Sequence, residues 1–140
     1  MATGAARPVV TFSPALQRLA ALPILTVIAT KREDGSIQLN PIWFELRDGL
    51  VVVNSNTKRA WPRNLQRQKE ATFLLVDPDK AAERYAQIHG RLVAVTPDPN
   101  VEVINRLSRR YTGKPFRELE PGEERITFTI EPVRVTGQMI

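Results

Sequence analysis

Two Asp-Gly pairs, each set between runs rich in apolar and β-branched residues, constrain the fold of this chain more than any other feature. Asp34-Gly35 separates residues 24–30 from residues 37–46, and Asp48-Gly49 separates residues 37–46 from residues 50–55. An Asp-Gly pair tolerates the positive φ angles that tight hairpin turns need. The three runs are therefore predicted to form an antiparallel β-meander.

Three further strands and three helices are predicted along the rest of the chain. The first helix begins at Ser13-Pro14, because serine caps free amides and proline suits the first helical turn. Six short strands joined largely as hairpins, with few helices, are typical of a small antiparallel barrel, closed or partly closed. The further strands are expected at residues 71–76, 85–95 and 125–130, with an extension over 133–139, and the helices at residues 14–22, 61–68 and, starting within 96–100, up to 111.

The chain has 140 residues, which is the size of one domain. Residues 1–12 are expected to form a flexible N-terminal tail, and residues 13–140 a single barrel domain. No apolar run reaches the roughly 18 residues needed to span a bilayer, and residues 1–8 lack the apolar core of an export signal. Because the chain also lacks cysteine, we expect a cytoplasmic protein that does not bind membranes.

The residue types present exclude most common catalytic centres. Without cysteine, thiolate metal sites and cysteine nucleophiles are impossible, and the single histidine, His89, cannot form a multi-histidine metal site. His89 lies in a predicted strand and is expected to be hydrogen-bonded to its sheet neighbours. An enzyme built from this chain would therefore take its reactivity from a bound redox cofactor, while the protein supplies binding and orientation.

Positive charge is concentrated in one short segment. Residues 58–69 contain five Lys or Arg residues and no acid, and the whole chain has a net charge of +5, so the remainder is neutral. A local excess of this kind favours an anion site, whereas proteins that bind nucleic acid usually spread their basic face more widely. A solvated helix face is the alternative interpretation. Partners are therefore expected to be small molecules, with nucleic acid less favoured.

Two segments contain candidate binding residues. In the first, residues 37–46, the side chains of Gln38 and Asn40 point to one side of the strand and that of Pro41 to the other. Because proline removes a ladder donor, Pro41 marks either an edge or bulge of the sheet or a place where a ligand meets the backbone.

The second segment, residues 55–65, leaves a strand with several hydroxyl groups, presents a cationic turn and enters a helix. The free amides at a helix start favour an anion. Guanidinium groups add charge-assisted hydrogen bonds to phosphate. The side chains that could together ligate a phosphate are those of Ser55, Thr57, Lys58, Arg59 and Arg63.

An ordered set of short motifs runs through most of the chain. They are Gln38-x-x-Pro41-x-Trp43-Phe44, Asp48-Gly49, the stretch from Thr57 to Arg63-Asn64-Leu65, Asp77-Pro78, Arg84-Tyr85-x-x-Ile88-x-Gly90, Arg110-Tyr111-x-Gly113 and Pro132-x-Arg134-Val135. This set resembles the split-barrel flavin and deazaflavin enzymes of the pyridoxamine 5′-phosphate oxidase-like superfamily, specifically the branch of small coenzyme F420-dependent oxidoreductases. The resemblance covers residues 22–135.

The resemblance implies a mainly β (α+β) fold, a six-stranded antiparallel split β-barrel of the FMN-binding type, and a homodimer with cofactor in clefts between the subunits. It also implies the positions of the cofactor contacts. Phosphate or ribityl contacts are matched by Ser55, Arg59, Arg63 and Asn64, and ring contacts by Gln38, Asn40 and Pro41, while Lys58 lies beside the matching pattern.

One position departs from the family pattern. Members commonly have lysine three residues before the Asn-Leu pair, where this chain has Trp61. We expect Trp61 to stack on the cofactor or line the acceptor pocket rather than serve as a routine core residue, while Arg59 and Lys58 hold the phosphate. The chain also ends at Ile140 without the residues that bind substrate phosphate in true pyridoxamine 5′-phosphate oxidases. That activity is therefore not expected.

Two classes of function remain open. The first is a homodimeric oxidoreductase that uses a deazaflavin (F420), or alternatively FMN, to transfer hydride to a small electron-poor organic acceptor, with water or Tyr85 as proton source. The second is a non-catalytic protein that binds a flavin, a deazaflavin or haem. A basic barrel that binds nucleic acid is less favoured, because such barrels expose several aromatic residues and aromatics are only 6% of this chain.

Overall fold

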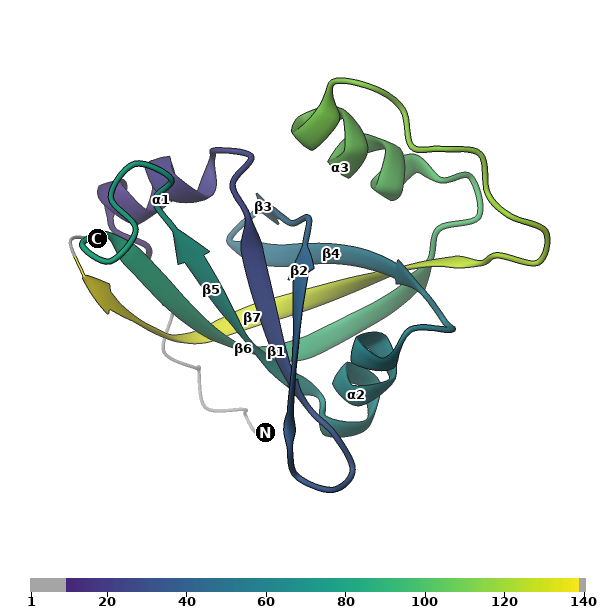
Figure 1. Cartoon of the computed structure of the whole chain (residues 1–140), viewed down its shortest axis with the longest axis horizontal. Helices are drawn as coiled ribbons and strands as arrows, with labels where there is room; N and C mark the ends of the chain where they lie inside the picture. The colour runs from purple at the N-terminus through teal and green to yellow at the C-terminus, as the bar shows by residue number, and fades with distance from the viewer. Residues whose placement is uncertain (1–9, 139–140) are drawn as a thin grey trace, which may run out of the picture.

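Seven strands and three helices are formed by residues 10–138, the part of the chain that the computed structural model describes (Figure 1). The mainly β architecture with three helices is as predicted. In chain order the elements are α1 (Pro14–Ala20), β1 (Thr26–Lys31), β2 (Ile37–Ile42), β3 (Glu45–Arg47), β4 (Leu50–Asn56), α2 (Ala60–Gln68), β5 (Glu70–Val76), β6 (Tyr85–Pro97), α3 (Glu102–Thr112) and β7 (Arg125–Gln138).

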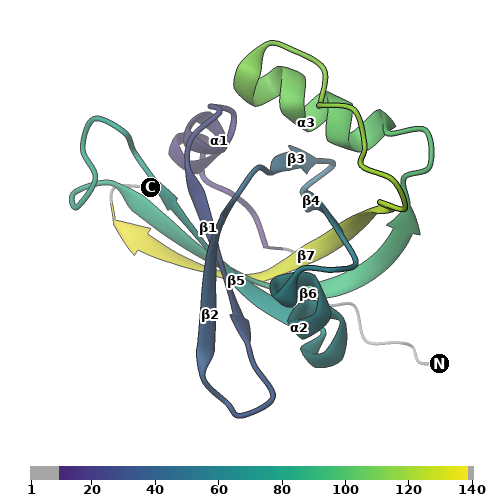
Figure 2. The same ribbon diagram turned by 45° about the vertical axis from the view of Figure 1, so that its right-hand side comes forward.

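All the strands belong to one antiparallel sheet in the order β2-β1-β5-β6-β7-β4-β3. The predicted number of six strands is wrong, because the run 37–46 divides into β2, which pairs with β1, and β3, which pairs with β4. The sheet curls in Figure 2, yet β2 and β3 stand at its opposite edges and do not pair, so the barrel is not closed. The predicted meander is therefore wrong as well.

The division falls at Trp43 and Phe44, which belong to neither strand. Phe44 is 1% exposed and lies in the core, and its backbone N–H donates to the Tyr111 hydroxyl at 3.3 Å instead of to a neighbouring strand. Two residues earlier in β2, Pro41 has no N–H to offer the ladder. Burial of an aromatic side chain thus turns the chain away from β2 and toward the opposite edge of the sheet.

Both Asp-Gly turns form as predicted. In the β3–β4 turn, Asp48 and Gly49 have φ angles of 54° and 79°. In the β1–β2 turn, Gly35 has a φ of 90°, and the Asp34 carboxylate accepts hydrogen bonds from the Ser36 backbone N–H and hydroxyl at 2.9 Å and 2.6 Å. Local turn chemistry therefore fixes both hairpins.

The two longest strands, β6 and β7, pair with each other in the middle of the sheet. The β6 strand runs past its predicted end at residue 95 to Pro97, whereas β7 ends at Gln138, within the extension expected over residues 133–139. The β7 strand continues through Pro132, which lies opposite Gly90 beside a shift in register. A Cβ atom at Gly90 would lie 2.4 Å from the Ile130 side chain, so only glycine fits there. His89 makes the expected sheet contact, with Nδ1 at 2.9 Å from the Thr72 hydroxyl oxygen.

The core lies inside the curled sheet and is closed by α1 and α2. Ser13 caps α1 as predicted, since its hydroxyl accepts from the Leu16 N–H at 3.0 Å, and Leu16 and Leu19 are buried. Of the tail expected over residues 1–12, residues 1–9 lie outside the described residues. Phe12 is 8% exposed and belongs to the core, so the folded domain begins before Ser13.

The third helix is attached to the molecule from outside the core and flanks β4 opposite α2 in both views (Figures 1 and 2). The Arg110 guanidinium donates to the backbone oxygens of Ala20, Ala21 and Leu22 at 2.7–3.2 Å, which caps the end of α1. The Tyr111 hydroxyl donates to the Ile24 carbonyl oxygen at 3.0 Å. None of the helices among residues 10–138 is long and apolar enough to cross a membrane.

Candidate cofactor-binding site

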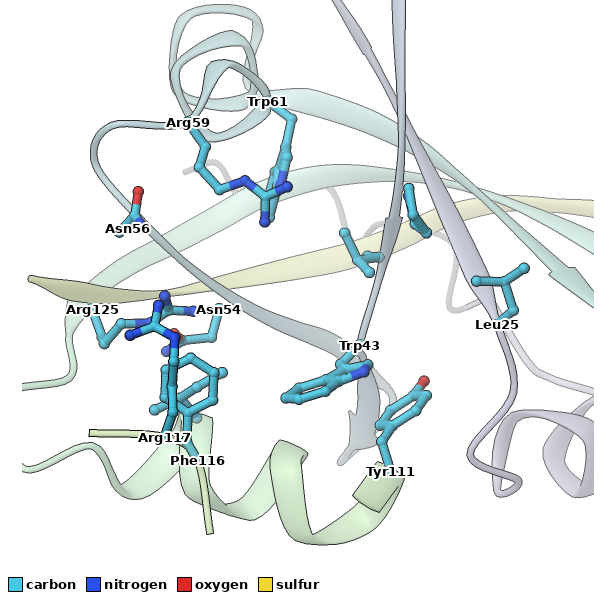
Figure 3. A pocket seen from close by; sticks show the side chains of 13 residues that line it. Leu25, Trp43, Asn54, Asn56, Arg59, Trp61, Tyr111, Phe116, Arg117 and Arg125 are labelled. Atoms are coloured by element: carbon cyan, nitrogen blue, oxygen red, sulfur yellow. The ribbon is translucent and has the colours of Figure 1, made fainter. Parts of the chain in front are cut away.

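A pocket of about 620 Å³ opens between β4, the start of α2, α3 and the segment that leads into β7 (Figure 3). This volume is within the range of sites that hold a small organic molecule. The lining combines aromatic rings, amides and guanidinium groups, and contains no carboxylate among the described residues. It consists of Leu25, Pro41, Ile42, Trp43, Asn54, Asn56, Arg59, Trp61, Ile104, Tyr111, Phe116, Arg117 and Arg125.

Arg59 contributes positive charge from the α2 side of the pocket. It is the N-cap residue of α2, with an extended backbone at φ −84° and ψ 153°, and no side chain caps the first-turn amides. Its exposed guanidinium makes no hydrogen bond or ion pair within residues 10–138. The first turn of α2 also has no acidic residue. Arg59 and the free amides of α2 therefore present an anion-binding edge.

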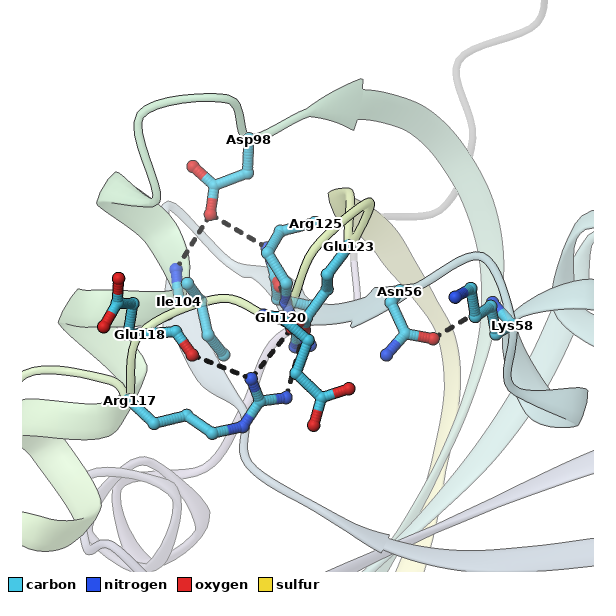
Figure 4. Close-up of polar contacts among 10 residues, drawn as sticks. Asn56, Lys58, Asp98, Ile104, Arg117, Glu118, Glu120, Glu123 and Arg125 are labelled. Atoms are coloured by element: carbon cyan, nitrogen blue, oxygen red, sulfur yellow. Dashed lines mark hydrogen bonds and ion pairs between the residues drawn. The ribbon is translucent and has the colours of Figure 1, made fainter.

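The opposite side of the pocket is organised around Arg125. Its side chain is only 7% exposed, and its Nε donates to the Asn54 Oδ1 at 3.0 Å. The Asn54 Nδ2 in turn donates to the Asp98 carboxylate at 3.2 Å and to the Thr127 hydroxyl at 3.0 Å. Asp98 also accepts the Ile104 backbone N–H at 3.0 Å, so one network joins β4, β7 and the start of α3 (Figure 4).

Glu123 is the acidic partner of two guanidinium groups. Its carboxylate accepts from Arg125 at 2.9 Å and from Arg117 at 2.8 Å and 3.1 Å. The hydrogen bonds from Arg117 are the largest cause that lowers the pKa of Glu123, from 4.5 to about 2. The Phe116 ring packs against both cations, with guanidinium carbons at 4.7 Å and 4.9 Å from its ring centroid. We call Phe116, Arg117, Glu123 and Arg125 the arginine wall.

Aromatic rings connect the arginine wall to the far end of the pocket. Trp43 stacks on Tyr111 with centroids 5.6 Å apart, and meets Phe116 edge-on at 6.3 Å. The Tyr111 hydroxyl is occupied in both hydrogen-bonding roles, by the Phe44 N–H and the Ile24 carbonyl, and burial raises its pKa above 10.0. The Tyr111 side chain is therefore held in place, uncharged, in the lining of the pocket. Tyr85, the side chain considered as a proton source, does not line this pocket.

Three of the predicted site residues line the pocket: Pro41, Arg59 and Trp61. Others are oriented by contacts elsewhere. The Gln38 Oε1 accepts from the Arg32 Nε at 3.0 Å, and the buried Asn64 amide donates to the Thr30 hydroxyl at 3.2 Å. The remaining predicted residues lie outside the lining: Asn40, whose Oδ1 is buried without a partner, and the exposed Thr57, Lys58 and Arg63.

Ser55 differs from its neighbours in β4 because alternate residues of a strand face opposite sides. Ser55 is 1% exposed and its hydroxyl has no hydrogen-bond partner, whereas Asn54 and Asn56 line the pocket. The predicted segment therefore borders the pocket, but Asn54 and Asn56 supply the pocket surface in place of Ser55. Residues 50–53 are all apolar, so the sequence shows no alternation that reveals which face of the strand would meet solvent.

Trp61 is both a core residue and part of the lining. It is 1% exposed and packs against Phe128 with ring centroids 6.0 Å apart. The expectation that it is not a routine core residue is therefore wrong as regards burial. Its Nε1 is buried without a hydrogen-bond partner, at a position that borders the pocket.

The arginine wall was missed by the sequence reasoning. Phe116, Arg117 and Glu123 lie in the segment between α3 and β7, where no helical or strand periodicity drew attention to them. The available signal was weak: two arginines and four glutamates within nine residues, ending at the first residue of a predicted strand. Only the fold brings Asn54 and Asp98 beside them.

Comparisons with known proteins place this chain in a family. A family model described as pyridoxamine 5′-phosphate oxidase matches residues 12–138, and the chain therefore belongs to this family. A comparison with curated protein sequences finds no significant match.

Solved structures show the same fold. A structure named F420 reductase superposes with a TM-score of 0.77 at 27% identity, covering 86% of this chain and 94% of its own. The conserved hypothetical protein Rv2991 of Mycobacterium tuberculosis gives a TM-score of 0.72 at 22% identity, with coverage of 96% and 89%. HupZ of Group A Streptococcus gives 0.66 at 15% identity, with coverage of 91% and 94%.

Proposed function

We propose that this protein is an oxidoreductase that holds a deazaflavin (F420), or alternatively FMN, in the pocket and reduces a small electron-poor organic acceptor. The observation that carries the proposal is the unpaired Arg59 guanidinium at the start of α2, facing a pocket walled by aromatic rings. Membership of the family and the similarity to an F420 reductase support it.

The residues present fit such a cofactor. Arg59 and the free first-turn amides of α2 suit a phosphate, because both supply donors and positive charge without an internal acid. Pro41 and Trp43 offer an apolar surface for a planar ring. The buried Trp61 Nε1 is a donor without a partner at the same border, and a polar ligand atom there would remove the cost of an unsatisfied donor.

The bound cofactor would supply hydride-transfer chemistry, and the protein's own residues would bind, orient and exclude water. Trp43 and Tyr111 form a stacked wall that shields the pocket. Because both hydrogen-bonding roles of the Tyr111 hydroxyl are occupied, it holds the wall in place instead of delivering a proton. No side chain of the lining is then required as a general acid, and water serves as the proton source.

We favour F420 over FMN because the approach to the pocket is cationic. Lys58 and Arg63 are exposed beside Arg59 and make no ion pair within residues 10–138. They would attract the acidic tail that F420 carries, and FMN has no such tail. Gln38, Asn40, Ser55, Thr57 and Asn64 remain predicted contacts that a bound cofactor would have to reach.

We also propose that the protein acts as a cytoplasmic homodimer. Trp43 and Phe44 are not suited to contact with a second copy, since Phe44 is buried in its own chain and Trp43 lines the pocket. The exposed apolar residues of edge strand β2, Ile37 and Leu39, are 56% and 63% exposed and offer a better surface for that contact.

Titration of the purified protein with F420 and with FMN, followed by cofactor fluorescence, tests the proposed function. Arg59→Ala should weaken binding by roughly 1.5–3 kcal/mol, because a charge-assisted contact to phosphate is lost. The matched control is Arg109→Ala, an exposed α3 arginine outside the pocket lining, which should leave affinity unchanged. Arg67 would be unsuitable as a control because it donates to the Lys31 carbonyl at 2.6 Å.

Saturable binding of either cofactor, lost selectively in Arg59→Ala, would support the proposal. Equal affinities of the wild type and both variants would place the phosphate elsewhere. If neither F420 nor FMN binds, the protein is not the proposed oxidoreductase, and haem becomes the next ligand to titrate.

A further inference from the structure

The pocket has a second cationic side that a phosphate at Arg59 does not use. Arg59 and Trp61 approach it from α2, while Arg117, Phe116 and Arg125 approach it from the other side, beyond Asn54 and Asn56 (Figure 3). The two sides are therefore separate groups of positive charge facing one cavity.

Arg125 is nearly buried and has N–H donors without an acceptor. Its side chain is 7% exposed, and two protein acceptors hold it: Asn54 Oδ1 at Nε, and Glu123 Oε2 at Nη1. Its Nη2 makes no hydrogen bond to any of residues 10–138, although the residue lines the pocket. A guanidinium presents five N–H donors in a fixed plane, which matches the two oxygens of a carboxylate.

The charge of the arginine wall is also incompletely balanced. Two guanidinium groups, Arg117 and Arg125, share the single carboxylate of Glu123, so one positive charge remains within the wall, while Glu120 acts on Arg117 from outside it. Because the pKa of Glu123 is about 2, that carboxylate stays ionised and is fully engaged at neutral pH. An anion that enters the pocket would therefore meet oriented donors and net positive charge.

The surroundings of the wall suit a conjugated ligand. Both cations pack against the Phe116 ring, and Trp43 lies edge-on to that ring at 6.3 Å and stacks on Tyr111. A planar molecule lying along Trp43 would bring a terminal group to Arg117 and Arg125. Aromatic surface beside oriented guanidinium groups recognises a flat acid better than a flat neutral molecule.

We propose that the arginine wall is an acceptor subsite that binds the carboxylate of a planar, conjugated organic acid. That the ligand is the hydride acceptor rests on the proposed function, whereas the preference for a flat carboxylate rests on the contacts of the arginine wall. The preferred substrates would then be conjugated acids, and uncharged analogues of the same shape would bind poorly.

The test uses cinnamate as the probe and cinnamamide as its uncharged analogue, measured by calorimetry on the full chain with and without cofactor. Cinnamate should bind at least about tenfold more tightly than cinnamamide, since only the carboxylate makes charge-assisted hydrogen bonds. Arg117→Gln should remove about that advantage without affecting cinnamamide. Arg117 is half exposed, so this variant should fold.

Two further variants complete the design. Arg125→Lys keeps the charge but loses the planar donor pair, and should weaken cinnamate binding severalfold. Arg109→Gln removes one arginine charge from α3 outside the lining and should change nothing. Thermal unfolding of each variant confirms that the compared proteins are folded.

The outcomes separate this proposal from the proposed function. Arginine-dependent cinnamate binding in a protein that binds neither F420 nor FMN would support the subsite while overturning the cofactor. Equal binding of cinnamate and cinnamamide would overturn the subsite. The subsite would also be overturned if Arg117→Gln weakened the binding of F420 but not of FMN and left cinnamate binding unchanged. In that case the arginine wall would bind the acidic tail of the cofactor.

Discussion

Arg59 at the start of α2 and Arg125 at the start of β7 line the same pocket but are held in opposite ways. Arg59 is exposed, and its guanidinium makes no hydrogen bond or ion pair among the described residues. Arg125 is almost buried and is fixed by Asn54 and Glu123. A free guanidinium adapts to its ligand at an entropic cost, whereas a fixed one is ready to bind only ligands that match its geometry.

The contacts that hold the two sides of the pocket in place also differ. The α2 side stands on an apolar core through Trp61 and Leu65, both buried. The α3 side stands on a polar network that runs from Asp98 through Asn54 to Arg125 and Glu123 (Figure 4). Packing thus positions the first side, and hydrogen bonds position the second.

Trp61→Lys should have the largest effect, because it removes the packing beneath the α2 side and places an ammonium in the core. We expect a loss of about 4 kcal/mol or more in the free energy of unfolding. Trp43→Lys is the matched control, since Trp43 is only half-buried and should cost clearly less. Urea unfolding followed by circular dichroism measures both.

A stable Trp61→Lys protein that binds cofactor more tightly would mean that position 61 faces the ligand and not the core. That result would restore the role first expected for Trp61 and remove the contrast between the two sides.

Asp98→Ala should have the next largest effect, because it breaks the polar network where it joins α3. The carboxylate is 5% exposed and accepts from the Val103 and Ile104 N–H groups at 3.2 Å and 3.0 Å and from Asn54. Its loss leaves these donors unmatched at the start of α3, at an expected cost of about 2–3 kcal/mol. Asp79→Ala, at an exposed turn, is the control. Chemical unfolding of the two variants provides the comparison.

If Asp98→Ala unfolds at the same urea concentration as the wild type, the α3 side does not depend on this network. Fixed hydrogen bonds would then not explain how Arg125 is oriented.

Glu123→Gln should lower the stability of the fold above pH 4.5 and should also change its pH dependence. The pKa of Glu123 is lowered in the folded state, from 4.5 to about 2, chiefly by its hydrogen bonds with Arg117. A lowered pKa stabilises the fold above the unfolded value of 4.5, and that stabilisation is lost as pH falls toward 2. The variant should therefore show a shallower fall in Tm between these pH values.

Thermal melts from pH 6 down to about pH 2 would record the difference, with Glu124→Gln, at an exposed neighbouring position, as the control. Parallel Tm curves for the wild type and Glu123→Gln would mean that the arginine wall is loosely held, like Arg59.

Much of the fold followed from local patterns. The Asp-Gly pairs predicted both hairpins, and Ser13-Pro14 predicted the start of α1. The α2 and α3 helices also lie where the sequence placed them, because their termini carry local signals such as Gly113 with its φ of 77°. In the site, the same local reasoning reached Arg59 and Pro41, whose charge and backbone chemistry are visible without a fold.

Tertiary structure decided the remainder. Only packing of Phe44 against the core divides residues 37–46 and sends β3 to the far edge of the sheet. Only pairing of β4 with β7 brings Asn54 within reach of Arg125, 71 residues later in the chain. The sequence by itself determined turns, helix ends and where charge accumulates, because these depend on neighbours in the chain. Which face of β4 meets the pocket, and which cations share one carboxylate, depends on contacts between distant residues that no local pattern encodes.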